Sequence, residues 1–360
     1  MRIRLEKRPE HSKAMTVLSP VIAIGLTVIV GGIIFALRGS DPLEALYVYF
    51  IEPLTEWWSI QAVIVKATPL VLIGAGLAVS YLANVWNIGA EGQLTIGAVA
   101  GGMLPILFPE WQSPLTIVGM MLLGIAGGMI YGAIPAVLKT RFGANEILTS
   151  LMLVYVAQLF LDWLVRGPWR DPKGFNFPKS ITFSDWQTLP YLTSSIHIGV
   201  LFALAAAVAL AVMVGRTLKG FEVRVSGGAP RAGRFAGFSR GKMVMFCFLV
   251  SGGLAGLAGV VEIASTVGQL QPQISPGYGF AAIIVAFLGR LNPVGALLAG
   301  LLLALSYIGG EAVQISLGIS EKVARVFQGI LLFFILACDT LILYRIRIDV
   351  GRAGELQAAE

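Results

Sequence analysis

The chain has 360 residues, of which 56% are hydrophobic and only 13% charged, with a net charge of +6. Soluble domains carry about a quarter of their residues as Asp, Glu, Lys or Arg, so the composition excludes an ordinary soluble domain. The two cysteines, Cys247 and Cys338, lie in apolar runs and imply no disulfide framework. The two histidines, His11 and His197, have no spacing that would build a metal site.

Apolar runs between charged residues predict an all-α membrane protein with about ten transmembrane helices, since about 20 apolar residues cross a hydrocarbon core. The third and eighth runs are too short to cross upright and could be half-helices packed inside the bundle. The predicted spans are, in order, 15–37, 62–82, 94–108, 115–138, 147–165, 198–215, 243–262, 279–290, 293–313 and 323–344.

Charged loops predict the orientation, because cytoplasmic loops are enriched in Lys and Arg. The loop 216–242 carries many basic residues against Glu222 alone, whereas the segment after Arg38 and before the second span carries only acidic charges. Both chain ends are therefore expected in the cytoplasm. The expected parts are a basic N-terminal tail (1–14), a transmembrane domain (15–344) with external segments 38–61 and 166–196, and a C-terminal tail (345–360).

The motif Asn87–Gln93 places a carboxylate, two amides and two glycines between apolar segments. Ionisable groups at membrane depth are costly unless paired or wetted, and glycine there lets another backbone approach closely. A second polar break, Ser275–Gly279, precedes the apolar run 280–288 in the same way. Paired breaks of this kind are typical of an inverted repeat of five helices and a transport path. The alternative is that the two stretches are similar only because glycine-rich runs recur in membrane helices by composition.

The predicted path or gate residues all lie in or near these two breaks: Asn87, Gly89, Glu91, Gly92, Gln93, Gln271, Gln273 and Tyr278. The alternative for the amides is that they only satisfy backbone groups. For Glu91 a structural role, accepting hydrogen bonds from free N–H groups of the break, is preferred over direct contact with solute.

The loop 216–242 contains a second unusual stretch, which predicts a short docking helix over residues 229–238. Pro230 suits a first helical turn, and small residues alternate with basic and aromatic ones. The alternative is a loop whose charge only sets the topology. The predicted docking residues, with both aromatic rings projecting, are Ala229, Pro230, Arg231, Arg234, Phe235 and Phe238.

Other patterns narrow the function. Gly124, Gly128 and Gly132 are spaced for close helix packing, as are Gly252 and Gly256. Gly241-Lys242 is not part of a phosphate loop, because Ala236 and Met243 replace required residues, so this chain is not expected to hydrolyse ATP. An ion-coupled carrier would need several buried ionisable groups; the few candidates are interpreted as anchors or local ion pairs: Lys66, Asp162, Glu262, Arg325 and Asp339.

The stretch Asn84–Leu94 resembles the signature of permease subunits of bacterial ATP-binding-cassette (ABC) importers in the branched-chain amino acid, ribose and nucleoside group. The nucleoside or simple-sugar branch is most similar, although Trp86 stands where that branch commonly has Phe. Supporting stretches extend over most of the chain: Asp41–Ala45, Ala67–Leu70, Gly143–Ile147, Ser251–Gly259 and Gly277–Phe280.

The resemblance implies a multi-pass subunit of a bacterial inner membrane that forms the path for nucleosides or related simple sugars. It implies as partners a cytoplasmic ATPase that binds the ATP, an external solute-binding protein and a sister permease in a heterodimer. No cofactor and no nucleic acid are expected. The alternatives are a permease of the same family for a pentose or a branched-chain amino acid, and an ion-coupled carrier.

Overall fold

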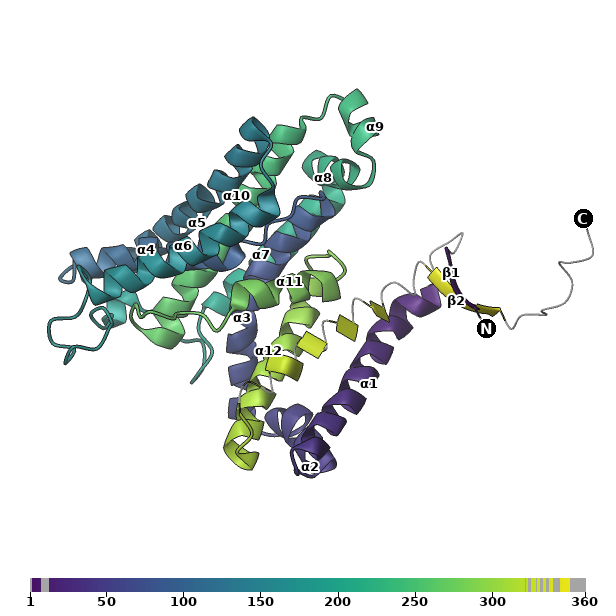
Figure 1. The fold of residues 1–360 in the computed structure, drawn as a ribbon. Coiled ribbons are helices and arrows are strands. Elements are labelled where there is room, and N and C mark those ends of the chain that lie inside the picture. Colours follow the sequence, from purple (N-terminus) through teal and green to yellow (C-terminus); the bar gives the residue numbers. More distant parts are fainter. Residues whose placement is uncertain are drawn as a thin grey trace, which may run out of the picture. The chain divides into compact units, whose positions relative to one another are not determined.

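The structure is a computed structural model that describes residues 2–7, 13–320 and 344–349, and between the last two ranges only 322, 325–327, 329–330, 333–334 and 337–338. The chain divides into two compact units (Figure 1). One comprises Met1–Pro53 with Gly309–Glu360, and the other Leu54–Ile308. The predicted span 323–344 lies in large part outside the described residues.

The first unit contains α1 (Lys13–Leu37), α2 (Pro42–Phe50) and the end of α12 (Gly295–Leu317). Phe35 and Tyr49 pack on the ring of Phe327, with centroid distances of 5.8 and 4.7 Å. The chain ends also pair: β1 (Arg2–Lys7) is antiparallel to β2 (Tyr344–Asp349). The sequence analysis treated these segments only as tails, although both alternate polar and apolar residues with the period of a strand.

The second unit is a helical bundle. Its helices are α3 (Trp57–Leu82), α4 (Ala90–Leu107), α5 (Pro114–Phe142), α6 (Glu146–Arg166), α7 (Gly199–Arg216), α8 (Leu218–Gly228), α9 (Pro230–Phe235), α10 (Arg240–Glu262), α11 (Tyr278–Leu288) and the first part of α12. It also contains a 3₁₀ turn, Asp185–Gln187, and a π turn after α10, Ile263–Val267. Another 3₁₀ turn, Glu52–Leu54, lies where the chain passes from the first unit to the second. Each predicted span from 62–82 to 293–313 coincides with a helix.

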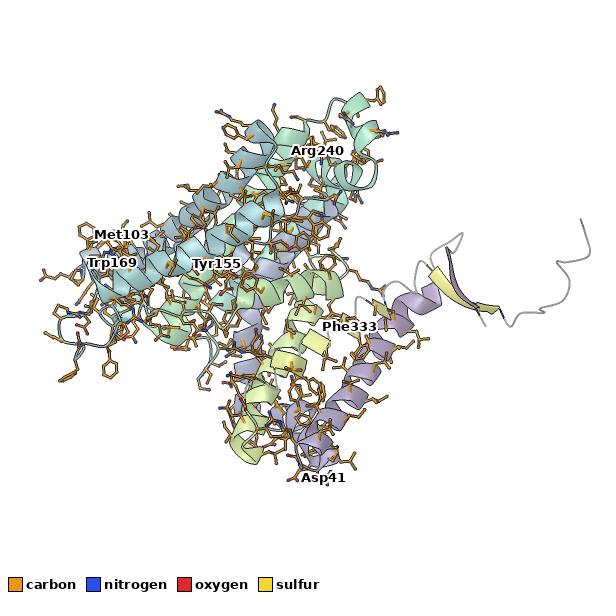
Figure 2. The ribbon with its side chains drawn as sticks, in the orientation of Figure 1. Asp41, Met103, Tyr155, Trp169, Arg240 and Phe333 are labelled. Carbon is orange, nitrogen blue, oxygen red and sulfur yellow. The ribbon has the colours of Figure 1, made fainter. Side chains whose placement is uncertain are left out.

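Six of the described helices are long and apolar enough to cross a membrane: α3, α5, α6, α7, α10 with its π turn, and α12. They make the chain a mainly helical, multi-pass membrane protein. Large apolar side chains point away from the bundle, among them Met103 on α4 and Tyr155 on α6, which is 55% exposed (Figure 2). An apolar exterior of this kind suits contact with lipid.

Local signals set where the helices begin and end. Asn145 caps α6 by accepting a hydrogen bond from the Ile147 N–H at 2.9 Å. Gly143 ends α5 with a φ of 69°, a left-handed conformation that glycine adopts without strain. Helices α5 and α6 are therefore joined by a tight turn, within which Lys139 forms an ion pair with Glu146.

Close packing of α4, α5 and α10 depends on glycine, as the spacing predicted. A methyl group on Gly97 would meet the backbone of Gly256, and one on Gly128 would meet the carbonyl oxygen of Gly252. Helix α3 is buried without interruption from Ala67 to Tyr81. The Ser80 hydroxyl in the last turns of α3 donates to the Cys247 carbonyl oxygen at 3.1 Å, so the end of α3 lies against the first half of α10.

Candidate functional site

The first predicted break is a real interruption between α3 and α4. Asn84 has a left-handed φ of 56°, after which the chain continues without helical structure to Gly89, the N-cap of α4. The Tyr81 hydroxyl donates to the Asn87 carbonyl oxygen at 2.9 Å. This bond ties the break to the last turn of α3.

Asn87 is completely buried and uses its whole amide group. Its Nδ2 donates to Gln93 Oε1 and to Ser251 Oγ on α10, both at 2.8 Å. Its Oδ1 accepts from the Gly89 N–H at 3.0 Å and from Gln93 Nε2 at 3.1 Å. In this conformation the amides of Asn87 and Gln93 satisfy one another and the break.

Glu91 joins the first break to the second. The carboxylate is 2% exposed, and its Oε2 accepts a hydrogen bond from the Gly279 N–H at 2.6 Å. The Ser275 hydroxyl also bonds to it. Ser275 Oγ in turn accepts from the N–H groups of Gly277 (3.0 Å) and Tyr278 (2.8 Å). Glu91 thus lies in the first turn of α4 and against the start of α11, where two helix dipoles present their positive ends to its carboxyl group.

Glycine is required where these helices meet. A methyl group on Gly279 would lie 2.5 Å from the Glu91 Cα, and one on Gly92 would lie 2.9 Å from the Val154 Cα on α6. One on Gly89 would lie 2.8 Å from the carbonyl oxygen of Ser150, also on α6. The start of α4 is therefore held between α6 and α11 by direct backbone contact. We call this cluster, Asn87 to Gln93 with Ser251, Ser275 and Gly279, the junction.

Gln271 and Gln273 lie in the non-helical segment between the π turn and α11. At one end of this segment, a methyl group on Gly102 of α4 would lie 2.9 Å from the Leu270 side chain. At the other end, Gly279 contacts Glu91 in the first turn of α4. The segment therefore runs alongside α4, from Gly102 back to the first turn of that helix. That is roughly 16 Å of helix, or about half of a hydrocarbon core. Gln271 Nε2 donates to the Gln273 carbonyl oxygen at 3.2 Å. Neither glutamine joins the Asn87 network.

Tyr278 is almost completely buried, and its ring packs edge-on against Tyr307 on α12 at 6.0 Å between centroids. The structure therefore brings Asn87, Glu91 and Gln93 together with Tyr278, but leaves the glutamines of the second break apart. Sequence reasoning did not predict the roles of Ser150, Ser251 and Ser275. Serine in a membrane helix packs as a small residue and also donates hydrogen bonds, and the sequence does not distinguish these uses.

The loop 216–242 contains two helices, and the docking helix predicted over residues 229–238 corresponds to the second, α9 (Pro230–Phe235). Thr217 caps α8, and Ala229 ends α8 and begins α9, with Pro230 in the first turn. Phe235 is 92% exposed, as predicted, and Arg231 and Arg234 are also exposed. The prediction that Phe238 projects is wrong. Its ring packs edge-on against Phe221 at 6.1 Å and is half-buried, because α8 offers an apolar surface under the turn.

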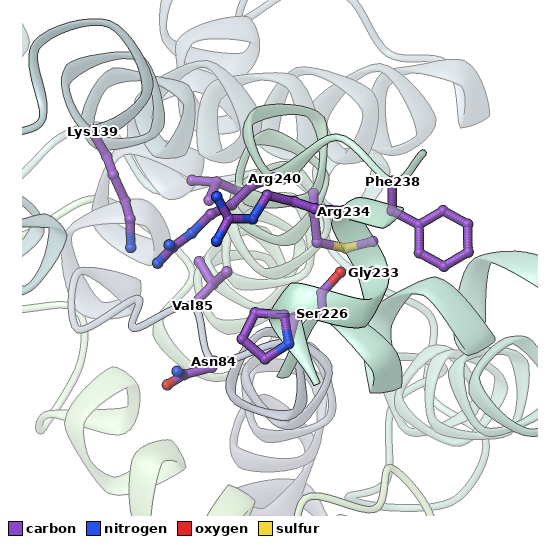
Figure 3. A pocket seen from close by; sticks show the side chains of 12 residues that line it. Asn84, Val85, Lys139, Ser226, Gly233, Arg234, Phe238 and Arg240 are labelled. Carbon is purple, nitrogen blue, oxygen red and sulfur yellow. The ribbon is translucent and has the colours of Figure 1, made fainter. Parts of the chain in front are cut away.

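Helix α8 contacts the end of α3 near the junction. A methyl group on Gly227 would meet the carbonyl oxygen of Leu82, and Val223 packs into one apolar cluster with Val79, Val85 and Phe248. The segment also borders a cavity lined by Asn84, Lys139, Arg234 and Arg240 (Figure 3). Residues 216–242 and the junction are thus connected through packed side chains and backbone.

We compared the chain with known protein families, and one family covers both the junction and the α8–α9 segment. A family profile described as "Branched-chain amino acid transport system / permease component" matches residues 59–336. The chain belongs to this permease family. It is therefore a permease component of an ABC transporter, as the stretch from Asn84 to Leu94 suggested.

Several relatives match this permease along nearly their whole length. The glucose ABC transporter permease TsgB13 of Haloferax volcanii is 36% identical, over 93% of this chain and 91% of the relative. The nucleoside ABC transporter permease NupB of Lactococcus lactis is 27% identical, over 97% of each. The guanosine ABC transporter permease NupP of Bacillus subtilis is 29% identical, over 93% and 96%.

Among solved structures, an inward-facing metal-chelate type ABC transporter is similar with a TM-score of 0.45 and 14% identity, over 89% of this permease and 99% of that chain.

Proposed function

We propose that this permease forms part of the solute path of an ABC importer, and that the path passes the junction. The observation that carries the proposal is the hydrogen bond from Gly279 to Glu91, which joins two helix starts from distant parts of the chain inside the bundle. Interrupted helices that meet at their starts are typical of solute and ion sites in transporters. Asn87, Gly89, Glu91, Gly92 and Gln93 shape the wall of the path, and Tyr278 supports it from α11.

Gln271 and Gln273 present amide groups to the same path from the non-helical segment. That segment follows α4 at a depth where backbone groups need protein or water as partners. A water-filled path beside it would satisfy them. The two breaks, Asn87–Gln93 and Ser275–Gly279, each with the apolar run that follows it, are then corresponding parts of an inverted five-helix repeat.

The solute is a nucleoside or a related simple sugar. Two of the relatives are named for nucleosides or guanosine and one for glucose. Uptake into proteoliposomes that contain the permease with its partner subunits tests this choice. Adenosine, guanosine, uridine, cytidine or glucose should compete for uptake; competition only by leucine would contradict it.

ATP is bound and hydrolysed by a separate cytoplasmic ATPase that docks on α9, so this chain carries no enzymatic step. A movement of α9 reaches the junction because α8 contacts the end of α3 at Gly227 and packs beside Phe248 of α10. Uptake that survives a protonophore while ATP is present supports this energy source. Uptake that stops with the proton gradient would identify an ion-coupled carrier instead.

We propose ten spans with both chain ends and α9 in the cytoplasm of a bacterium, because the loop 216–242 is basic. The segment 166–196 is then outside, where a solute-binding protein docks. A sister permease completes the path. Phe175 and Phe235 are matched probes, with exposures of 93% and 92%, and the two native cysteines are buried. A membrane-impermeant maleimide added outside should modify Phe175→Cys and leave Phe235→Cys unmodified. The reverse pattern would contradict the topology.

A further inference from the structure

A cavity with a basic lining lies beside α9 (Figure 3). Its walls come from five parts of the bundle: the α3–α4 break (Asn84), the end of α5 (Lys139), α8 (Ser226), α9 (Arg234) and the start of α10 (Arg240). The cavity has about 80 Å³ of free space. A single water molecule needs roughly 10–15 Å³ of such free space, so a carboxylate with its methylene group fits.

The ends of the Lys139, Arg234 and Arg240 side chains gather at this cavity (Figure 3). Lys139 is paired with Glu146, which lines the adjoining depression rather than this cavity. Within the part of the chain that the structure describes, no ion pair is found for Arg234 or Arg240, and no acidic side chain lines the cavity. The site is therefore positively charged and holds no acidic side chain from the residues that the structure describes.

We infer that the cavity receives a carboxylate side chain of the partner ATPase. The inference rests on the proposed docking of the ATPase at α9, and it adds a polar contact beside the exposed ring of Phe235. Two guanidinium groups facing one space can bind a carboxylate through several charge-assisted hydrogen bonds. Phe235 supplies apolar area and the cavity supplies charge recognition.

The position of the cavity favours a protein carboxylate over a lipid headgroup. Helices α5, α8, α9 and α10 and the break after α3 contribute to its walls, so it lies at the end of the bundle where these elements meet rather than along its lipid-facing side. A partner that packs on Phe235 would also reach Arg234, because the two residues are neighbours on the same short helix, α9. The ATPase docking surface and the cavity thus form one continuous face.

Charge removal tests the inference in the complete importer, purified with its ATPase. In Arg234→Gln with Arg240→Gln, the ATPase should bind about tenfold more weakly or worse, since truncating one side of a desolvated charge pair speeds dissociation. The matched control is Arg224→Gln, because Arg224 is exposed on α8, is not among the predicted docking residues and does not line the cavity. Its ATPase binding should be unchanged. Unchanged ATPase binding in the double variant overturns the inference.

A covalent readout identifies the occupant. Arg240→Lys keeps the charge and provides an amine that a carbodiimide can join to a carboxylate. Mass spectrometry should find Lys at this position linked to an Asp or Glu of the ATPase. A link only to Glu146 of this chain, or loss of bound anionic phospholipid with ATPase binding unchanged, overturns the inference.

The proposed docking is tested separately by Phe235→Ala. If that variant releases the ATPase while the double Arg variant retains it, docking at α9 stands and the cavity inference fails. If neither variant affects ATPase binding, both fail.

Discussion

The junction and the α8–α9 segment are both polar interruptions of an apolar chain, yet their polar groups are used in opposite ways. At the junction Asn87 and Glu91 are buried and bonded to groups from α10 and α11. On α9 the side chains of Arg234 and Phe235 are exposed. Buried polar groups must find partners inside the protein, whereas exposed ones remain available to a second protein. Polarity in the sequence therefore does not separate an internal support from a docking surface.

The largest effect is expected for Gly279→Ala, which tests whether the junction depends on backbone contact. The added methyl group would lie 2.5 Å from the Glu91 Cα and 2.8 Å from the Ala90 carbonyl carbon. Overpacking of this kind costs about 1–3 kcal/mol or more, because backbone cannot move aside as a side chain can. The midpoint of thermal unfolding in detergent should fall and uptake should be lost.

Gly228→Ala is the control for that change, since a methyl group there meets nothing within 4 Å. Its unfolding midpoint should equal that of the unchanged protein. Equal midpoints for both variants would show that the α4–α11 contact is not tight.

The second expected effect concerns the charge at the junction. Glu91→Gln keeps the side-chain shape but removes the charged acceptor of the Gly279 N–H. A hydrogen bond to a charged group contributes about 1.5–3 kcal/mol, so both stability and uptake should decrease. Glu110→Gln, at an exposed loop position, should change neither. Wild-type uptake and stability in Glu91→Gln would show that the charge is dispensable.

The third prediction separates the two aromatic residues of the α8–α9 segment. Phe235→Ala should leave the stability of the permease unchanged, because its ring is 92% exposed. It should abolish solute-stimulated ATP hydrolysis, since truncating a buried interface aromatic costs about 2 kcal/mol or more.

Phe238→Ala should instead lower stability, by about 0.5–1.5 kcal/mol for the lost pair with Phe221 beyond its burial. Stability is measured by thermal unfolding and coupling by ATPase assay on the complex. If Phe238→Ala affected only coupling and Phe235→Ala only stability, the assignment of the two rings would be reversed.

The smallest effect is expected at His197, in the loop before α7. The side chain is 2% exposed, and its Nδ1 accepts a hydrogen bond from the Gly199 N–H at 3.1 Å. Burial lowers the pKa of His197 to about 4. The unfolded chain therefore binds the proton more readily, and stability is expected to fall as the pH drops from about 6.5 toward 4.

Unfolding midpoints of the permease and of His197→Gln between these pH values check this expectation. The part of the pH dependence that belongs to His197 should disappear in the variant. Identical pH profiles would show that His197 is not held neutral by burial.

Much of the helical architecture followed from the sequence. The predicted spans from 62–82 to 293–313 all coincide with helices, because an apolar run of this length in a membrane must satisfy its backbone internally. The break at Asn87 and the glycine faces of α5 and α10 were also predicted correctly. Shorter elements were missed or misjudged: α2, α8 and the strand pair β1–β2 lie in segments too short or too polar for an apolar run to mark them.

The sequence alone determined that Glu91 needs a partner, since a carboxylate among apolar segments cannot remain unbonded. Only the tertiary structure decided that the partner is the N–H of Gly279, which is 188 residues away. In the same way the sequence marked 229–238 as a docking segment, while the packing of α8 decided that Phe235 is exposed and Phe238 is not. Composition and spacing indicate which residues need a hydrogen-bond partner or a docking partner. Which residue becomes the partner depends on contacts between distant segments, and the order of residues in the chain does not show those contacts.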